Sequence, residues 1–263
     1  MNQQTDKAIM VVSFGTSYEA SRKATIEKID IRNAFQDHRI YRAWTSKFII
    51  SILKKRDNYT VPTIKEALEQ MITDGIREVV VQPTHILDGI ENNIMKEEVL
   101  SYKESFDKIA FGTPLLADSK DESQAINAVT TEFSDLKETE ALVFMGHGTE
   151  HFANSAYSQF ENMLRDLGHE STYVGTVEGF PSLDYVIRRL KIREIKKVYV
   201  MPLMIVAGDH AHNDMAGDSP DSWVCQFENA GFEVCPIIKG LGEYPGIRRM
   251  YVEHAQKAID SMK

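Results

Sequence analysis

The sequence predicts an α/β protein of two similar lobes, each a doubly wound parallel sheet flanked by helices, that face each other across a cleft. Three observations support this fold class. The chain contains an internal repeat, each copy alternates apolar strands with amphipathic helices, and 263 residues suffice for two lobes of ordinary size. We expect a first lobe at residues 1–138 and a second at residues 139–263, because the charged stretch Asp135–Glu140 suits a boundary.

The repeat is clearest where Pro62–Pro83 aligns without a gap with Pro181–Pro202. Each copy begins with proline, continues with apolar residues at steps of three and four, and ends in a short apolar run. Such steps place the apolar residues on one face of a helix, and the run is typical of a buried strand. Both copies therefore predict a helix, with proline in its first turn, followed by a strand.

Further matches supply the other strands of each half. They pair Val11–Ser17 with Val143–Glu150, Ile40–Thr45 with Tyr173–Glu178, and Ala110–Leu116 with Glu233–Gly240. Each half is thus predicted as strand, helix, strand, helix, strand, with a fourth strand downstream.

Residues able to bind a metal follow the predicted strands of the second half. His147 follows the first strand, Glu178 the second, and His210 lies shortly after the third. Because the carboxyl ends of parallel strands meet at one edge of a sheet, we expect these side chains to lie together. Two imidazoles and a carboxylate suit cobalt, nickel, zinc or ferrous iron, with open positions for water or substrate. A histidine at a glycine turn, a solvent-facing acid and a loop hydrogen bond are the alternatives for the three residues.

The first half carries no such ligand set at the matching places. Its candidate substrate-binding residues are Ser13, Phe14, Gly15, Thr16, His85 and Glu91. Backbone N–H groups of the Ser13–Thr16 turn suit an anion. His85 is expected to line the cleft, with core packing as the alternative. His212 would point away from His210 in an extended segment, and His151 is expected at the surface.

Composition excludes several classes of function. The net charge of -9 argues against a general nucleic-acid binder. The start of the chain has no basic segment followed by an apolar one, and no apolar run approaches about 18 residues. We therefore expect a cytoplasmic protein with no membrane partner. Cys225 and Cys235 are predicted to be reduced thiols. The sequence is compatible with a homo-oligomer.

Taken together, the motifs resemble the class II tetrapyrrole chelatases, and most closely the anaerobic sirohydrochlorin cobaltochelatases of the CbiK type. The resemblance covers essentially the whole chain, and the stretch that starts at Met201 is its most specific part. The matching motifs are VVSFGTSY at Val11, YRAWTS at Tyr41, VFMGHGT at Val143, VGTVEGFP at Val174, MPLMIVAGDHAHNDMAGD at Met201 and GLGEYPGIR at Gly240.

This resemblance implies an enzyme that inserts Co(II) into sirohydrochlorin during cobalamin synthesis and releases two protons. It implies that His147, Glu178 and His210 bind the metal and that His147 also accepts a pyrrole proton. Co(II) is then a substrate, and no nucleotide or redox cofactor is expected. The glycines beside His147 are expected to let the backbone approach a flat macrocycle. An iron or nickel chelatase, a non-catalytic tetrapyrrole or metal carrier, and a periplasmic-type binding protein are the alternatives.

The expected substrate carries carboxylates, whereas the chain is net negative. Electrostatic steering must therefore be local. Arg42, Lys47 and the run Lys54–Arg56 are the candidate cations, and a solvated helix end is the alternative for that run.

Overall fold

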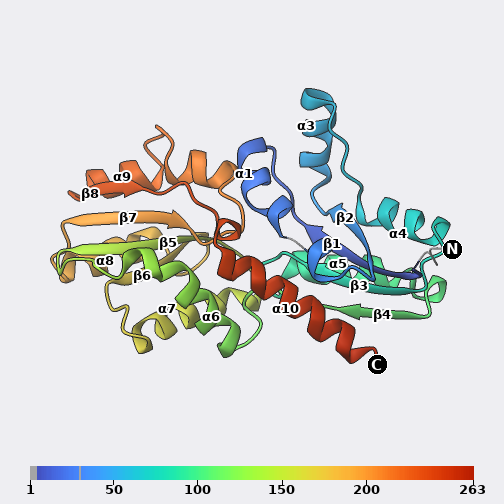
Figure 1. Cartoon of the computed structure of the whole chain (residues 1–263). Helices are drawn as coiled ribbons and strands as arrows, with labels where there is room; N and C mark the ends of the chain where they lie inside the picture. Colours follow the sequence, from blue (N-terminus) through green and yellow to red (C-terminus); the bar gives the residue numbers. More distant parts are fainter. Residues whose placement is uncertain (1–4, 30) are drawn as a thin grey trace. The chain divides into compact units, whose positions relative to one another are not determined.

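The computed structural model describes residues 5–29 and 31–263. The chain divides into two compact units, residues 1–117 with 248–263, and residues 118–247 (Figure 1). Within the described residues, each unit contains a four-stranded parallel sheet with helices packed on it. The predicted fold class of two doubly wound α/β units is confirmed.

The first unit is built on a sheet with the strand order β2-β1-β3-β4. Its strands are β1 (Lys7–Ser13), β2 (Arg39–Trp44), β3 (Glu78–Pro83) and β4 (Lys108–Phe111). Its helices are α1 (Glu19–Ala24), α2 (Ile31–Ala34), α3 (Lys47–Asp57), α4 (Ile64–Thr73), α5 (Ile90–Leu100) and most of α10 (Pro245–Ser261). The single turn η1 (Ile26–Lys28) lies between α1 and α2, and the turn η2 (Lys103–Ser105) lies between α5 and β4.

The second unit has the corresponding strand order β6-β5-β7-β8. Its strands are β5 (Glu140–Gly148), β6 (Thr172–Glu178), β7 (Lys197–Pro202) and β8 (Glu233–Pro236). Its helices are α6 (Ser119–Thr130), α7 (Ser155–Asp166), α8 (Leu183–Ile192) and α9 (Trp223–Asn229), with the turns η3 (Thr131–Phe133), η4 (Phe152–Asn154), η5 (Ala211–Met215) and η6 (Leu241–Glu243). Among the described helices of both units, none combines the length and hydropathy that crossing a bilayer requires.

The internal repeat holds residue by residue. α4 and β3 occupy the same positions of the first copy as α8 and β7 occupy in the second. Thr63 and Ser182 are the N-caps, and each hydroxyl accepts a hydrogen bond from the backbone N–H three residues later. The prolines precede these caps, so the prediction of proline in the first turn was wrong. A hydroxyl can satisfy a free N–H group at a helix start, which proline cannot do.

Strand pairing corrects one alignment between the halves. Trp44 of β2 and Thr176 of β6 occupy equivalent places in the two sheets. The position of Glu178 therefore corresponds to Ser46 rather than to Thr45. Ser46 caps α3, so the first unit begins a helix where the second unit places a carboxylate.

The division into units differs from the expected boundary after residue 138. α6 packs on α7, and the amide of Gln159 donates to the carboxylate of Glu122 at 2.9 Å. α10 joins the first unit, where the Tyr251 hydroxyl donates to the carbonyl of Thr84 at 3.0 Å. The last helix of each half therefore belongs to the other unit. Charged sequence marks an exposed segment, but it does not say which sheet a neighbouring helix covers.

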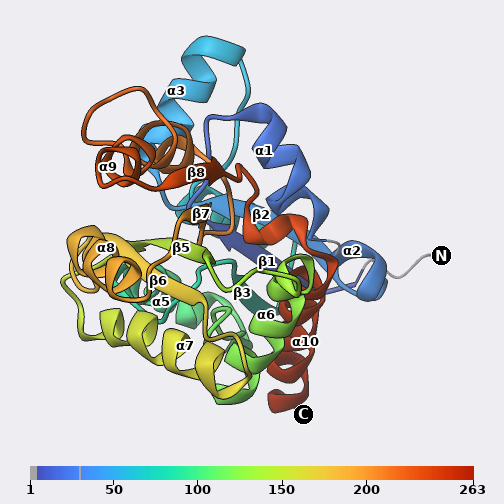
Figure 2. The ribbon, with the colours of Figure 1, turned by 90° about the vertical axis from the view of Figure 1, so that its left-hand side faces the viewer.

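The central strand β5 is buried on both faces, which explains its continuous apolar sequence. Val143 packs in a cluster with Trp223 and Phe227 of α9. Phe144 points to the opposite face and meets Phe160 of α7 edge to face, with ring centroids 6.2 Å apart. Figure 2 shows α6 and α7 together on that side of the sheet. The end of β5 is therefore held firmly from both sides.

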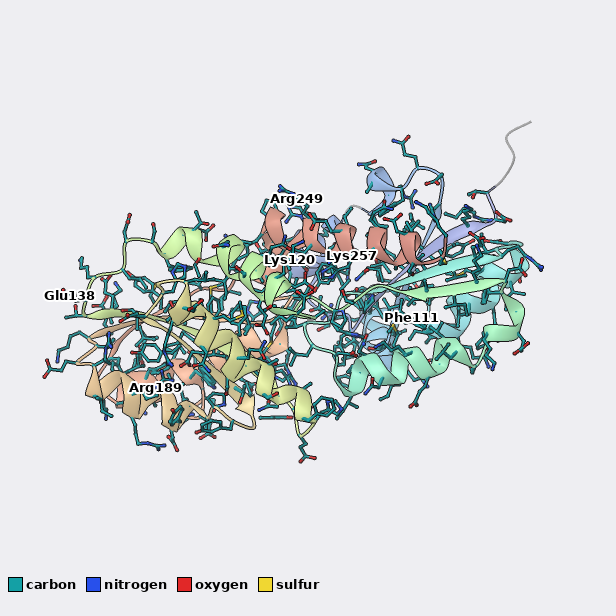
Figure 3. All side chains as sticks on the ribbon, turned by 90° about the horizontal axis from the view of Figure 1, so that it is seen from below. Phe111, Lys120, Glu138, Arg189, Arg249 and Lys257 are labelled. Atoms are coloured by element: carbon teal, nitrogen blue, oxygen red, sulfur yellow. The ribbon has the colours of Figure 1, made fainter. Side chains whose placement is uncertain are left out.

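A buried carboxylate anchors the edge strand β6. Glu161 of α7 accepts the backbone N–H of Val174 at 2.8 Å. Arg165 also pairs with Glu161, and so does Arg189, labelled in Figure 3, with its Nη1 2.7 Å from the carboxylate. The two guanidinium groups compensate the buried negative charge of Glu161. The carboxylate also accepts a backbone N–H that would otherwise have no partner at the edge of the sheet.

Replacing Tyr251 by Phe should lower the free energy of unfolding by about 1–2 kcal/mol, because a buried carbonyl loses a donor. The hydroxyl lies 3.0 Å from the carbonyl oxygen of Thr84 and 3.3 Å from that of His85. Denaturant titration measures the change. Tyr102→Phe is the control, because that hydroxyl is exposed and 3.4 Å from its partner Glu69. Equal losses in both variants would contradict the prediction.

Candidate metal-binding site

His147 lies at the carboxyl end of β5, exposed between two buried glycines. A Cβ on Gly146 would lie 2.3 Å from the Tyr157 ring, and a Cβ on Gly148 would lie 1.4 Å from the carbonyl oxygen of Glu178. Gly148 also has a φ of +86°, which disfavours other residues. The sequence led us to expect that these glycines admit a macrocycle. The structure shows that they admit Tyr157 and the backbone of Glu178.

The hydroxyl of Tyr157 braces the same turn from α7. It accepts the N–H of Gly148 at 3.3 Å, and burial raises its pKa. Glu178 is the last residue of β6 and pairs with Gly148 across the sheet. The backbones that carry His147 and Glu178 are thus joined, while the carboxylate of Glu178 is exposed.

His210 reaches the same place from the segment after β7. It directly precedes the π-helical turn η5, a geometry that is frequent at functional sites. The rings of His147 and His210 meet edge to face with centroids 4.6 Å apart. The structure therefore brings these two predicted residues together.

Hydrogen bonds at Nδ1 set the tautomer of both rings. His147 Nδ1 lies 3.0 Å from the carbonyl oxygen of Gly148, which can only accept. His210 Nδ1 lies 2.5 Å from a carboxylate oxygen of Asp214. A neutral imidazole that donates from Nδ1 carries its lone pair on Nε2. Both rings are thus prepared to bind a metal through Nε2, with an oxygen partner that orients each ring.

Asp214 is a site residue that sequence reasoning missed. It lies one helical turn after His210, and that spacing in DHAHND is the signal that could have found it. In an extended segment, His212 would have pointed away from His210. The segment is helical instead, with the N–H of His212 bonded to the carbonyl of Gly208 at 3.1 Å. His151 caps η4, and its Nδ1 accepts the N–H of Ala153.

Three acidic or imidazole side chains do not converge on a metal position anywhere in the described part of the chain. The rings of His147 and His210 are in contact. The backbone of Glu178 pairs with Gly148, the residue that follows His147. The structure therefore contains a histidine pair, and the exposed Glu178 is connected to it through the backbone pairing with Gly148.

Most of the predicted substrate-binding turn in the first unit is internal. The hydroxyl of Ser13 is buried and accepts from Thr84 at 2.9 Å, and Thr16 is buried too. A Cβ on Gly15 would lie 2.5 Å from the Trp44 ring. Phe14 is the side chain of this turn that reaches solvent, with 48% of its surface exposed. Glu91, in the first turn of α5, is also exposed.

The imidazole of His85 is largely enclosed. Its Nδ1 lies 3.5 Å from the amide oxygen of Asn92, and its buried Nε2 has no hydrogen-bond partner among the described residues. Burial lowers the pKa of His85 to about 4. Asn92 donates in turn to Asp88, which is paired with Lys96. His85 is therefore neutral near pH 7. Its enclosed ring contributes to packing.

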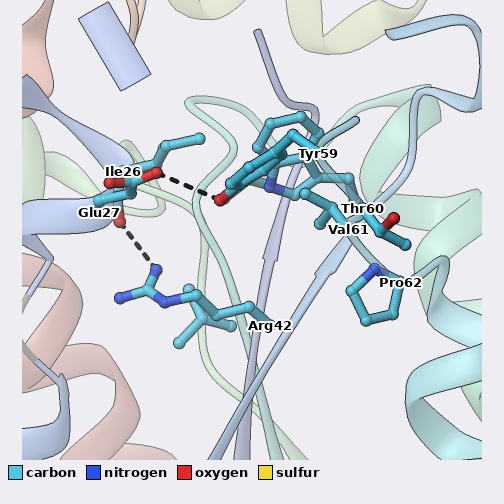
Figure 4. A pocket seen from close by; sticks show the side chains of 10 residues that line it. Ile26, Glu27, Arg42, Tyr59, Thr60, Val61 and Pro62 are labelled. Carbon is cyan, nitrogen blue, oxygen red and sulfur yellow. Dashed lines mark hydrogen bonds between the residues drawn. The ribbon is translucent and has the colours of Figure 1, made fainter. Parts of the chain in front are cut away.

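A cavity of about 200 Å³ in the first unit lies beside Arg42, one of the expected steering cations. Arg42 donates to the carbonyls of Ile26 at 2.8 Å and Ile29 at 3.2 Å, and the Tyr59 hydroxyl donates to Glu27 (Figure 4). The polar groups that line the cavity are therefore hydrogen-bonded within the protein. Arg42 consequently stabilises the fold, whereas Lys47 and Lys54–Arg56 are exposed.

Solved chelatase structures share this fold. SirB from Bacillus subtilis with Fe3+ has a TM-score of 0.67 at 14% identity and covers 97% of each chain. CbiX, whose structure is described as that of the terminal enzyme for siroheme biosynthesis in denitrifying bacteria, has a TM-score of 0.55 at 15% identity, over 96% of this chain and 99% of its own. At such identities the likeness concerns the fold alone, and the fold is that of the chelatases.

Sequence comparison is more specific. Residues 7–260 match the family model described as cobalt chelatase (CbiK). The sirohydrochlorin cobaltochelatase of Salmonella typhimurium is 38% identical over 256 residues, which is 97% of each chain. The sirohydrochlorin cobaltochelatase CbiKC of Nitratidesulfovibrio vulgaris is 31% identical over 263 residues, 98% of this chain and 92% of that one. The chain belongs to the cobalt chelatase (CbiK) family.

Replacing Gly148 by Ala should destabilise the protein much more than replacing Gly168 by Ala. Both glycines have a positive φ, +86° and +89°, but a Cβ on Gly168 meets no atom within 4 Å. Gly168→Ala should therefore cost only the left-handed conformation, about 1–2 kcal/mol. Gly148→Ala must also separate β5 from β6, which should add at least about 2 kcal/mol. Denaturant titration compares them, and equal costs would refute the close-approach argument.

The buried imidazole of His85 should make stability depend on pH. Its pKa is about 4 in the folded state against 6.5 for the unperturbed group, so protons bind the unfolded chain more readily between these values. His85 should contribute fully above about pH 6.5, and its contribution should fall by about 3 kcal/mol as the pH drops to about 4. The difference in unfolding free energy between the parent and His85→Gln isolates this contribution. A difference that stays constant from pH 7 to 4 would contradict the burial of the ring.

Proposed function

We propose that the protein is a sirohydrochlorin cobaltochelatase, which inserts Co(II) into the tetrapyrrole with release of two protons and serves cobalamin synthesis. The observation that carries this proposal is the histidine pair, His147 and His210, whose rings are in contact and both carry the lone pair on Nε2. Membership of the cobalt chelatase family and the names of the two relatives support the choice of metal and macrocycle. Co(II) and sirohydrochlorin are then the two substrates.

In this proposal His147 and His210 bind Co(II) through Nε2, and Glu178 provides a third ligand. The backbone of Glu178 is fixed by its pairing with Gly148, but its exposed carboxylate can turn towards the ion. Two oriented imidazoles and one mobile carboxylate leave coordination positions open. Open positions are what transfer requires, because pyrrole nitrogens must bind the ion before the protein releases it.

The same imidazole lone pairs can accept the pyrrole protons. Once the macrocycle has taken the ion from His147, Nε2 of that ring is free to take a proton. Metal binding and proton acceptance compete at one nitrogen, so transfer of the ion and removal of the proton are linked steps. Asp214 accepts a hydrogen bond from Nδ1 of His210 and so orients that ring with Nε2 available.

Residues of the first unit are proposed to bind the macrocycle. Phe14 offers an exposed aromatic face, and Glu91 an exposed carboxylate. Ser13, Gly15 and Thr16 shape the turn that presents Phe14, and backbone N–H groups of that turn suit substrate carboxylates. His85 supports this region from within. The exposed Lys47, Lys54 and Lys55 supply local positive charge on a negatively charged protein, whereas Arg56 is paired with Asp57.

The experiment that tests the proposal is anaerobic mixing of the protein with sirohydrochlorin and Co(II), followed by absorbance. Turnover beyond one equivalent distinguishes an enzyme from a carrier. Parallel runs with Fe(II) and Ni(II) compare the metals, because imidazole and carboxylate ligands accept all three. Binding of macrocycle or metal without insertion would refute the enzymatic function.

The two histidine variants should fail in different ways. His147→Ala should abolish insertion at every Co(II) concentration, because it removes a ligand and the proposed proton acceptor together. His210→Ala should lower the rate by roughly two orders of magnitude, or about 3 kcal/mol, with partial recovery at high Co(II). His151→Ala, outside the proposed site, should keep the parent rate. Rescue of His147→Ala but not of His210→Ala by metal would exchange the two roles, and the Asp214 contact would then mark His210 as the base.

A further inference from the structure

One side chain joins the loop that follows His147 to the loop that follows Glu178. Asn154, at the start of α7, accepts the backbone N–H of Thr149 on its Oδ1 at 3.0 Å. Its Nδ2 donates to the carbonyl oxygen of Phe180 at 2.6 Å. Thr149 and Phe180 each lie two residues beyond a proposed ligand. The amide therefore ties together the two chain segments that emerge from the site.

The chemistry of the bridge requires a carboxamide. The N–H of Thr149 can only donate and the carbonyl of Phe180 can only accept, so the bridging group needs one acceptor and one donor. An aspartate offers acceptors alone, and an aliphatic side chain offers neither. The fit is close, because a Cβ on Gly179 would lie 3.3 Å from the Oδ1 of Asn154.

The bridge extends the sheet beyond its last paired residues. β5 and β6 pair up to Gly148 and Glu178. Past that point the chains run into separate loops, and Asn154 links those loops by two hydrogen bonds in series. The N–H of Thr176 donates to the carbonyl of Pro181 at 2.7 Å, which holds the far end of the second loop. Glu178 is therefore restrained on both sides along the chain.

We propose that Asn154 is a positioning residue that sets the spacing between His147 and Glu178 and thereby the affinity for Co(II). This inference rests on the proposed function, since it takes both residues as ligands of the ion. Asn154 does not touch the metal in this scheme. It keeps the loop of Glu178 beside the loop of His147, so that the carboxylate reaches the ion without reorganisation of the backbone. Loss of a group that orients ligands typically lowers metal affinity by about 10–100-fold.

Two variants of Asn154 distinguish an effect on the position of the Glu178 loop from an effect of charge near the ion. Asn154→Leu keeps the approximate size and removes both hydrogen bonds. Asn154→Asp keeps the acceptor for Thr149 but sets a carboxylate against the carbonyl of Phe180. An added negative charge near a cation site would by itself tighten Co(II) binding, whereas displacement of the loop would weaken it. The two explanations thus predict opposite signs for Asn154→Asp.

The experiment titrates Co(II) into the full-length protein without macrocycle and follows the visible bands of the bound ion, whose intensity reports coordination geometry. Asn154→Leu and Asn154→Asp should each raise the dissociation constant by about tenfold and change the band intensity. Asn162→Leu is the matched control, an exposed asparagine on the same helix, and should bind as the parent does. Parent-like binding by both Asn154 variants, or tighter binding by Asn154→Asp, would overturn the inference. Should one variant fail to fold, the other decides alone.

A double-mutant cycle with Glu178→Gln distinguishes a positioning role from a general loss of structure. If Asn154 acts through Glu178, Asn154→Leu should change the Co(II) affinity of Glu178→Gln by less than about twofold. A full tenfold effect in that background would contradict the inference. Glu178→Gln alone tests the ligand role of Glu178, whereas insertion into sirohydrochlorin tests the proposed function. If it binds Co(II) as the parent does, the ligand role of Glu178 fails and the inference fails with it. If it binds weakly while the Asn154 variants do not, only the inference fails.

Discussion

The close approach of Gly148 to the carbonyl of Glu178 is the constraint on which the site depends. A Cβ on Gly148 would lie 1.4 Å from that oxygen, so no other residue fits without separating β5 from β6. The approach fixes where His147 leaves the sheet and where Glu178 begins its loop. Buried packing on both faces of β5 and the anchoring of β6 by Glu161 hold the approach in place. Chemistry at the strand ends thus depends on packing well inside the second unit.

Orientation of the two imidazoles comes from different sources that give the same result. His147 donates to a carbonyl of its own turn, whereas His210 donates to Asp214 one helical turn away. Both rings therefore carry the lone pair on Nε2. A resident metal would call for a closed set of rigid ligands, but an ion that must be released calls for an incomplete one. In the proposed function, the oriented histidine pair and the exposed Glu178 form such an incomplete set.

The two units keep one backbone plan but differ in chemistry. Gly15 and Gly148 occupy equivalent turns and both have positive φ, yet one admits the ring of Trp44 and the other the backbone of Glu178. Phe14 stands where the second unit has His147. A duplicated fold therefore offers two similar strand-end edges, of which one carries nitrogen ligands and the other an aromatic face. The fold requires glycine at both positions because a Cβ would clash there. The preceding side chains, Phe14 and His147, are not constrained in this way and differ between the units.

The sequence by itself determined that α4 and α8 are helices followed by strands, because apolar spacing acts over a few residues, whereas the hydroxyl caps that begin both helices came from the structure. The sequence also determined that His147 and Glu178 stand at strand ends and that His210 follows β7. Tertiary structure alone decided that α6 and α10 belong to the opposite units, since an apolar helix face does not specify the sheet that will cover it. It alone decided that Ser13 and His85 are enclosed, and that Asn154 joins the loop after His147 to the loop after Glu178. Those contacts join residues through turns and loops whose paths are set by packing, and packing between distant segments leaves no periodic pattern in the sequence.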